Sequence, residues 1–505
     1  MTLLRETKRL VLPPSSNLPQ RNDNSWLFLL PVAERAVWYG DPGPDRLAHL
    51  TGFFTHFSTV DDPADVGDGN PIDVVIIGPE ASAETVNASH QEASTAIVQL
   101  AGSVRVRQLR SWITPSIMRR RPTVVGRAHK LWRLVLARAT HTIGKPLPEA
   151  ARSHASDVNF TRIPEALTTT SDPNRVSIGL AEAGLPTYIV SMATAAGHHP
   201  SVRDWAFGPP RGFESQKVVF LMDKVEGVFQ TVVKITQHER FNDRLAAEGK
   251  ALKRLADFGA GESLSTPRHL FESTYKGRAV LAQSALSGAA MRSVARPDPA
   301  SATASAAFRG LIELGELETS RIEPGQRLQA FTDLAETFST IYRPPNAVRE
   351  RIDETVRRLG GADFPSVMMH GDPGMWNFLV VRDGRPGLLD WENADSRGVP
   401  LWDLFIFART FGVFLADARG IRYTHRTFTK QLLEASALKE VLFHQIREYR
   451  RRVDIPAEIV DDLFVMCWAQ QAVRQAAGLA SPAWGESTGT RFLGEALKTP
   501  LGFHD

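Results

Sequence analysis

Short apolar runs alternate with helically spaced stretches over the first part of the chain. The runs in ERAVWYG, HFSTV and PIDVVIIG, at 34–40, 56–60 and 71–78, are bounded by Gly, Pro or Asp, which is typical of strands. Because strands that alternate with helices favour a parallel sheet, we expect a Rossmann-like α/β domain in residues 1–150. Residues 151–205 are rich in Pro, Ser, Thr and Gly in places, and we interpret them as a connector.

A different pattern begins near Ser215. Four β-rich runs are predicted, the first two as a hairpin: SQKVVFLMD, GVFQTVVKIT, RHLFESTY and RAVLAQSAL. The helical run FNDRLAAEGKALKRLADFG lies between the second and the third, with Asn242 as its expected cap and Gly259 at its end. After about residue 300 the chain is mostly helical, apart from two apolar strands around residues 368–381. The fold expected from residue 206 is therefore α+β, with a β-rich part at 206–290 and a helical part at 291–505.

Composition adds a few limits. A chain of 505 residues suggests two or three domains, and 43% hydrophobic with 23% charged residues is ordinary for a soluble protein. Cys467 is the single cysteine, which excludes an intramolecular disulfide and a cysteine-based zinc cluster. It lies in the apolar run VMCWA, so we expect a buried, inert thiol.

Basic residues are concentrated in one segment. Residues 93–148 contain no Asp or Glu, and residues 105–145 include a basic stretch with helical spacing. This segment can be a solvated face or meet acidic parts of the same protein; it can also contact an anionic membrane surface or, less readily, nucleic acid. No RNA-binding motif or zinc finger accompanies it. Without a signal peptide or a spanning segment, we expect a cytoplasmic protein, with possible peripheral contact to the inner membrane face.

The second half supplies the residue types that phosphoryl transfer needs. That chemistry requires oxygen ligands for divalent metal ions, a carboxylate near the acceptor hydroxyl and a cation on the nucleotide phosphates. Lys234 ends a predicted strand and Glu248 lies on the next helix. Asp372 and Asn377 lie in MMHGDPGMWNFLVV, between two apolar runs, and Asp390 ends the strand GLLD. Each residue alone is commonly a surface or turn residue, but together they supply every residue type that phosphoryl transfer needs.

The motif HGDPGMWN followed by DWE resembles the signature of the aminoglycoside phosphotransferase and choline kinase family, relatives of protein kinases. The resemblance covers roughly residues 205–490 and implies a bilobal, protein-kinase-like fold. It implies that Asp372 orients or deprotonates the acceptor hydroxyl and that Asn377 and Asp390 hold Mg²⁺. It further implies that Lys234 contacts the phosphates of ATP and that Glu248 orients Lys234.

The same resemblance implies roles for four more residues. Gln283 and Ala285 fall at the hinge where adenine would meet the backbone. His370 is expected to hold the shape of the loop, and Asp403, in GVPLWDLFIF, to support it. The first hairpin lacks the Gly-x-Gly-x-x-Gly pattern, so we expect the phosphate-covering loop to be short or built otherwise.

Residues 1–150 weakly resemble the nucleotide-binding half of class I methyltransferases. The turn GDPGPD (40–45) and Asp61 stand where that family has a glycine-rich turn and a ribose-binding acid. Pro42 and Pro44 remove backbone donors from the turn, which favours a degenerate domain over a working cofactor site.

The expected activity is ATP-dependent phosphorylation of a hydroxyl on a small molecule or glycan precursor. The region 424–480 has no dense acidic cluster, which argues against a polycationic acceptor. The alternative is a nucleotide-binding pseudokinase with a regulatory or scaffold role. Nucleic acid is not an expected partner.

Overall fold

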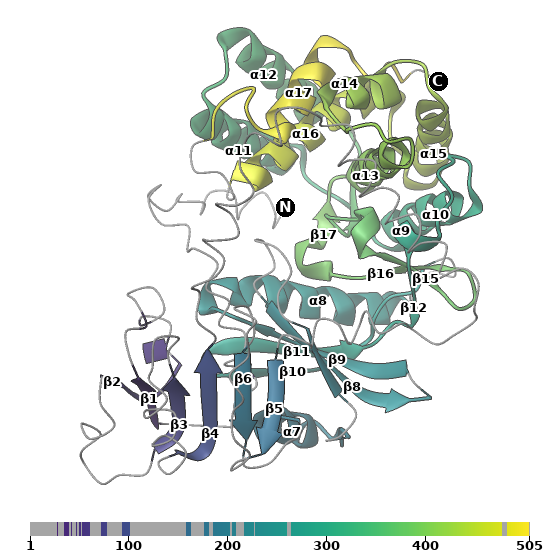
Figure 1. Cartoon of the computed structure of the whole chain (residues 1–505). Coiled ribbons are helices and arrows are strands. Elements are labelled where there is room, and N and C mark those ends of the chain that lie inside the picture. The colour runs from purple at the N-terminus through teal and green to yellow at the C-terminus, as the bar shows by residue number, and fades with distance from the viewer. Residues whose placement is uncertain are drawn as a thin grey trace, which may run out of the picture. The chain divides into compact units, whose positions relative to one another are not determined.

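The computed structural model describes the second half of the chain almost completely and the first half mainly as strands (Figure 1). The described residues are 28, 35–39, 42, 47, 50, 51, 53–60, 72–77, 93–100, 158–162, 176–180, 185–201, 205–208, 217–226, 228–259, 264–476 and 482–503. The chain forms two compact units, one of residues 19–211 and 217–233 and the other mainly of residues 234–505.

The N-terminal unit contains a six-stranded sheet with the order β2-β1-β3-β4-β6-β5. The predicted parallel arrangement is confirmed for its first strands, because β1 pairs in parallel with β2 and β3, and β3 with β4. The side chains of Ala36, Val37 and Trp38 are fully buried, as expected for a central strand with both faces covered. The strands are β1 (Arg35–Tyr39), β2 (His56–Val60), β3 (Ile72–Ile77), β4 (Ala93–Leu100), β5 (Val158–Arg162) and β6 (Val176–Leu180).

Two of these strands fall in the segment that the sequence indicated as a connector. β5 and β6 pair in parallel with each other, and β6 pairs antiparallel with β4, so the sheet is mixed. A helix, α7 (Thr187–Ala195), and a short strand, β7 (Trp205–Gly208), follow. The likeness to a methyltransferase domain stays a prediction, because Gly40, Gly43 and Asp61 lie outside the described residues. The basic segment 105–145 lies outside them too.

The predicted β-rich part forms a second sheet, with the order β10-β11-β9-β8-β7. β8 and β9 are neighbours, as the hairpin prediction requires, and β10 pairs antiparallel with β11. The strands are β8 (Lys217–Val225), β9 (Val228–Thr236), β10 (His269–Tyr275) and β11 (Arg278–Ser284). β8 ends at Val225 and β9 begins at Val228, so the connection between them is short, as expected.

The helix predicted after β9 is α8 (Asn242–Phe258), preceded by the 3-10 turn η5 (Glu239–Phe241). Gly259 ends it in a left-handed conformation with φ of 68°, but Asn242 does not cap it. Its side-chain oxygen accepts hydrogen bonds from the Thr236 hydroxyl (2.7 Å) and the Ala279 amide (2.8 Å), and its side-chain nitrogen donates to the Gly277 carbonyl oxygen (2.8 Å). The capping prediction is wrong because these tertiary partners take the side chain. Asn242 ties the start of α8 to β9 and β11.

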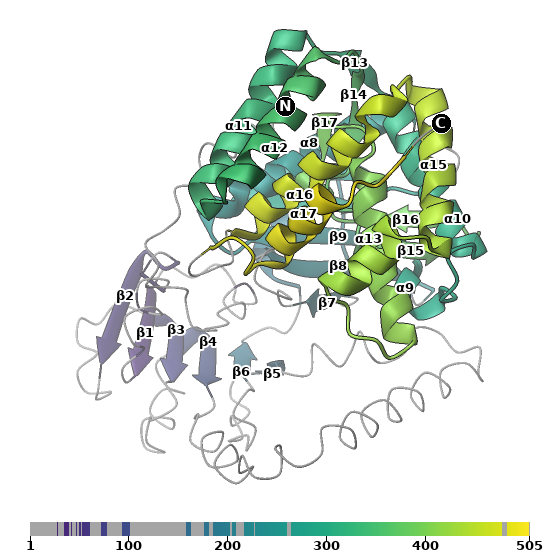
Figure 2. The same ribbon diagram turned by 90° about the horizontal axis from the view of Figure 1, so that it is seen from above.

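The remainder of the chain is mainly helical, with two small sheets, β12-β15-β16 and β13-β14-β17. Figures 1 and 2 show α11 and α12 side by side and α16 beside α17. The helices are α9 (Met291–Val294), α10 (Ala302–Leu317), α11 (Pro324–Tyr342), α12 (Asn346–Gly361), α13 (Trp402–Ala418), α14 (His425–Phe428), α15 (Ala437–Val453), α16 (Val460–Ala476) and α17 (Thr488–Lys498). The strands are β12 (Gly288–Ala290), β13 (Thr319–Arg321), β14 (Pro365–Met369), β15 (Phe378–Val381), β16 (Pro386–Leu388) and β17 (Asp395–Gly398). Shorter turns are η6 (Met375–Asn377), η7 (Trp391–Asn393), η8 (Thr429–Leu433) and η9 (Ala457–Ile459).

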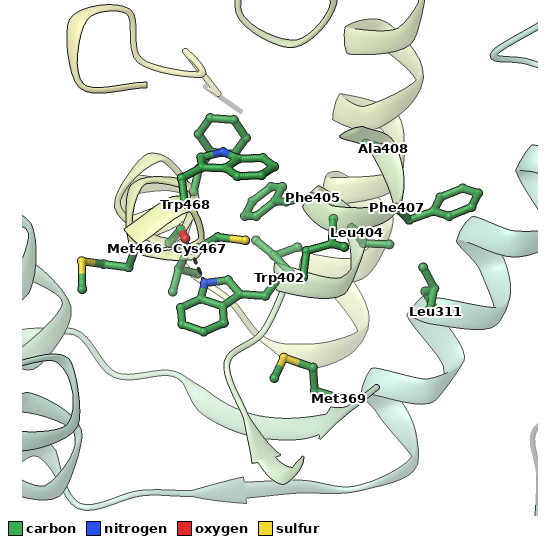
Figure 3. Packing of buried hydrophobic residues seen from close by; sticks show 14 of the residues in the cluster. Leu311, Met369, Trp402, Leu404, Phe405, Phe407, Ala408, Met466, Cys467 and Trp468 are labelled. Carbon is green, nitrogen blue, oxygen red and sulfur yellow. Dashed lines mark hydrogen bonds between the residues drawn. The ribbon is translucent and has the colours of Figure 1, made fainter. Parts of the chain in front are cut away.

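Aliphatic and aromatic side chains together form the core of this part, and Figure 3 shows residues of α13 and α16 within it. Trp402, at the start of α13, donates from its indole nitrogen to the carbonyl oxygen of Leu463 on α16 (2.9 Å). Cys467 lies in this cluster and is fully buried, and burial raises the pKa of its thiol well above the ordinary value. The prediction of a buried thiol is confirmed. No helix among the described residues is long and apolar enough to cross a membrane.

Candidate functional site

The segment 370–377 forms a tight loop between β14 and β15. Gly371 has φ of 82°, in the left-handed region that favours glycine. A Cβ at this position would also overlap the backbone carbonyl oxygen of Asn393. The middle residue of His-Gly-Asp must therefore be glycine for two reasons: its backbone conformation and the close approach of a second chain segment.

Asp403 holds the beginning of this loop. It lies in the first turn of α13, and its two carboxylate oxygens accept hydrogen bonds from the backbone amides of His370 (2.6 Å) and Gly371 (2.9 Å). Burial raises the pKa of Asp403 to about 7, although both amides favour the ionised form. These two hydrogen bonds join the start of α13 to the start of the loop.

His370 links the loop to the strand that precedes Asp390. Its Nδ1 accepts the amide N–H of Asp372 (3.2 Å), so Nε2 must carry the ring proton, which it donates to the carbonyl oxygen of Leu389 (2.9 Å). Burial lowers the pKa of His370 to about 4. The imidazole is thus neutral with one defined tautomer, and its edge packs against Trp391, with ring centroids 4.6 Å apart.

Asp372 and Asn377 face each other across the loop. The Asn377 side-chain nitrogen donates to the backbone carbonyl oxygen of Asp372 (2.8 Å) and approaches its carboxylate (3.4 Å). This orientation leaves the Asn377 side-chain oxygen pointing away from Asp372, and that oxygen has no hydrogen-bond donor within the described residues. The amide of Leu389 donates to the Asn377 carbonyl oxygen (2.9 Å), so the segment that carries Asp390 runs beside Asn377.

Lys234 lies between two carboxylates. Its ammonium nitrogen is 2.5 Å from Glu248 Oε1 and 3.2 Å from Asp390 Oδ1. Lys234 and Glu248 are buried, whereas the Asp390 side chain is 30% exposed. A buried ion pair needs such close geometry to offset the loss of hydration. The pairing of Lys234 with Glu248 that the sequence left open is thus present, and β9, α8 and the segment after β16 converge at this point.

Asp390 takes an unusual backbone conformation, with φ of 70° and ψ of 64°. Non-glycine residues adopt this region rarely, at a cost of roughly 1–2 kcal/mol. The turn η7 that follows is fixed by the Trp391 indole nitrogen, which donates to the Leu388 carbonyl oxygen (3.0 Å). This bend directs the Asp390 carboxylate toward Lys234.

The two residues that the resemblance implies for the hinge, Gln283 and Ala285, have no contact with this cluster among those described in the structure. Gln283 is buried near the end of β11, and its side-chain oxygen has no hydrogen-bond donor among the described residues. Ala285 is the first residue after Ser284, where β11 ends. The Ser284 amide donates to the Arg268 carbonyl oxygen (2.8 Å), which fixes the backbone just before Ala285.

The residues present fit a magnesium site of the kind that phosphotransferases use. Mg²⁺ prefers hard oxygen ligands and usually takes only one or two protein side chains, with substrate phosphates and water completing its shell. The Asn377 side-chain oxygen and the partly exposed Asp390 carboxylate meet that requirement. No cluster of three or more His, Cys, Asp or Glu ligands occurs in the described part of the chain, so a zinc-type cage is not seen there.

Three residues that support the loop were missed by the sequence reasoning. Arg474, on α16, donates to the Gly371 carbonyl oxygen, and Thr410, on α13, accepts the Met375 amide (3.3 Å). Arg409 is extensively desolvated, which lowers its pKa, while the charge of Asp372 raises it. For Arg409 the available signal was an arginine inside the apolar run FIFARTFGVF, where a charge needs a partner. Arg474 and Thr410 gave no comparable signal.

Comparison with known proteins identifies the part of the chain that carries this site. Residues 208–434 match the phosphotransferase enzyme family. The match includes Lys234, Glu248, the loop 370–377 and Asp390. The match covers less than half of the chain and agrees with the kinase-like fold that the resemblance implied for the second half.

Solved structures similar to the chain include three phosphotransferases. A macrolide 2′-phosphotransferase from Brachybacterium faecium is 18% identical with a TM-score of 0.39, covering 58% of this chain and 97% of its own. An aminoglycoside phosphotransferase from Streptomyces rimosus is 16% identical with a TM-score of 0.34, covering 57% and 97%. A choline kinase from Streptococcus pneumoniae is 14% identical with a TM-score of 0.39, covering 62% and 97%. Among curated proteins, none matches the chain.

Proposed function

We propose that the chain is an ATP-dependent phosphotransferase that moves the γ-phosphoryl group to a hydroxyl of a small molecule or glycan precursor. The observation that carries the proposal is the position of Lys234, 2.5 Å from Glu248 and 3.2 Å from Asp390, beside the loop that bears Asp372 and Asn377. A cation for phosphates, oxygen ligands for a metal and a carboxylate for the acceptor are the parts that this reaction needs.

In the proposed reaction, the acceptor oxygen forms a bond to the γ-phosphorus while the bond from that phosphorus to the ADP oxygen breaks. Asp372 orients the acceptor hydroxyl and takes its proton. Lys234, held by Glu248, neutralises charge on the phosphates of the nucleotide. Mg²⁺, when bound through Asn377 and Asp390, supplies further neutralisation of the phosphate charge. Gln283 and Ala285 are proposed to lie beside the adenine.

His370 and Asp403 would act by positioning. The neutral imidazole accepts a hydrogen bond from the Asp372 amide at Nδ1 and donates one from Nε2 to the Leu389 carbonyl oxygen, which fixes the backbone on both sides of the site. Asp403 secures the two amides that precede Asp372. Both residues thereby hold the Asp372 carboxylate in one place. Holding a catalytic group in the right geometry toward its substrate lowers the activation barrier.

The test is ATP turnover with a broad panel of hydroxyl acceptors, for wild type, Asp372→Asn and Asp390→Asn. Loss of a positioned base typically lowers the rate by about 10²–10⁴-fold, and we expect a loss of this order for Asp372→Asn. Asp383→Asn is the matched control, because Asp383 lies in the turn between β15 and β16 and its partner among the described residues is Arg385 of the same turn. Its turnover should equal that of wild type.

Equal rates for all four proteins would refute the proposal. ATP·Mg that raises the melting temperature of wild type, with no transfer to any acceptor, would favour the nucleotide-binding pseudokinase instead.

A further inference from the structure

An exposed tryptophan projects from the loop that carries Asp372. Trp376 is 59% exposed, the largest exposed fraction among the large hydrophobic side chains of the described residues. Its neighbours Met375 and Asn377 are both buried. Single exposed apolar residues are common on proteins and need no explanation. Trp376 needs an explanation because of its place in the chain. It lies one residue before the proposed metal ligand Asn377 and four residues after the proposed base Asp372.

The loop is built to hold this ring in one position. A Cβ at Gly374 would overlap atoms of the Trp376 indole, so the ring lies directly against the Gly374 backbone. The Gly374 amide in turn donates to the Asp372 carbonyl oxygen (2.8 Å), and the Asn377 amide donates to the Gly374 carbonyl oxygen (2.8 Å). One face of the indole is therefore packed on the loop, and the exposed area belongs to the rest of the ring.

We propose that Trp376 is the platform on which the acceptor binds, and that the acceptor is a carbohydrate whose pyranose ring stacks on the indole while one hydroxyl reaches Asp372. This inference rests on the proposed phosphotransferase function. A pyranose combines an apolar face of C–H groups with hydroxyls at its rim, and an exposed indole offers a large, rigid apolar surface at little cost in conformational entropy.

An exposed indole also attracts organic cations. Arg474 donates to the Gly371 carbonyl oxygen, so one guanidinium group lies on the loop that carries Trp376. A neutral pyranose needs no charged partner there, and an organic cation is included in the test as the competing acceptor.

The experiment compares acceptors that contain a pyranose ring with acceptors that lack one. Methyl glucopyranoside, N-acetylglucosamine and maltose supply pyranose rings; sorbitol and glycerol supply hydroxyls without a ring; choline supplies a cation. Phosphate transfer from ATP·Mg is measured for wild type, Trp376→Ala, Trp376→Phe and Gly374→Ala. Phe258→Ala is the matched control, because Phe258 is an exposed aromatic residue at the end of α8.

We expect transfer to at least one pyranose. Trp376→Ala should raise the KM for that sugar about tenfold or more while the KM for ATP stays unchanged, since the lost contact is to the acceptor. Trp376→Phe should restore part of the affinity because it keeps a flat ring, whereas Gly374→Ala should weaken sugar binding by displacing the indole. Phe258→Ala should change neither KM.

A second measurement does not depend on turnover. In the presence of ADP and magnesium, the same pyranoses should protect Trp376 from acrylamide quenching, measured as the difference in fluorescence between wild type and Trp376→Phe. The carbohydrate inference is overturned if no pyranose is phosphorylated or protects Trp376. It is overturned equally if sorbitol, glycerol or choline is used as well as the sugars, or if Trp376→Ala leaves the sugar KM unchanged. The phosphotransferase proposal fails separately, if wild type transfers phosphate from ATP to no hydroxyl acceptor, with or without a pyranose ring.

Discussion

Replacing Asp403 and His370 one at a time should make the free energy of unfolding depend on pH in opposite directions. Burial raises the pKa of Asp403 to about 7, so the folded protein keeps a proton that the unfolded carboxyl loses near pH ~3.9. Burial lowers the pKa of His370 to about 4, so the folded imidazole is neutral where the unfolded one, with a pKa near ~6.5, is charged.

The signs follow from proton linkage. The contribution of Asp403 to stability is fully present below the unfolded pKa and is lost as the pH rises toward its folded pKa, because the folded state binds the extra proton. The contribution of His370 has the opposite sign: it grows as the pH rises from its folded pKa toward its unfolded pKa, because there the unfolded state binds the extra proton. Each pKa unit corresponds to about 1.4 kcal/mol, so between pH ~4.5 and ~6.5 each group changes the free energy of unfolding by roughly 2–3 kcal/mol. In wild type the two changes nearly cancel.

The assay is urea unfolding followed by tryptophan fluorescence across this pH range, with linear extrapolation to water. Relative to wild type, Asp403→Asn should be most destabilising at the acid end and His370→Asn at the neutral end. Subtracting wild type removes the titration of all other groups. Asp383→Asn is the control: Arg385 holds the pKa of Asp383 below its ordinary value, so this carboxylate stays ionised throughout. Differences that slope in the same direction for both variants, or that do not vary with pH, would contradict the reasoning.

Two further predictions concern the loop and the ion pair. Gly371 and Gly384 have φ of 82° and 83°, but a Cβ would overlap Asn393 only at Gly371 and meets open space at Gly384. Gly384→Ala should therefore cost about 1–2 kcal/mol of stability and preserve ATP turnover, whereas Gly371→Ala should cost more and abolish turnover. Urea unfolding measures the stability and phosphate transfer measures the turnover. Equal effects of the two substitutions would argue against the close approach of Asn393 to Gly371. Replacing Lys234 or Glu248 by Met should lower the free energy of unfolding by roughly 3–5 kcal/mol, because each substitution leaves a buried charge without its partner. In a double-mutant cycle, the double variant should lose less stability than the sum of the two single variants. Additive losses would mean that the two side chains are not coupled.

The elements nearest the site could be predicted from the sequence because their signals are local. The β-rich runs before and after α8, the glycine at the end of α8 and the polar centre of MMHGDPGMWNFLVV all reflect neighbouring residues. The role of Asn242 could not, because its partners Thr236, Gly277 and Ala279 come together only when β9 and β11 pair. A side chain with a good tertiary alternative abandons its local cap.

The supports of the site were hidden for the same reason. Arg474 follows Gly371 by about a hundred residues, yet its guanidinium holds that residue's carbonyl oxygen. β5 and β6 were also hidden: VNFTR and VSIGL are short and lie in polar surroundings, and their pairing with each other and with β4 is what defines them. The boundaries proposed at residues 150, 205 and 290 remain predictions.

The anchoring of the segment before Asp390 bears on the thermodynamics of nucleotide binding. The Ser265 amide donates to the Pro386 carbonyl oxygen and the Leu388 amide to the Ser265 carbonyl oxygen, both at 2.9 Å, so the chain that leads into β10 is fastened to β16. This anchors the backbone just before Asp390, whose carboxylate lies 3.2 Å from the Lys234 ammonium, while Glu248 holds the same ammonium at 2.5 Å. Under the proposed function, ATP would meet a cation already held by Glu248, so less of its binding free energy would be lost in ordering that part of the site.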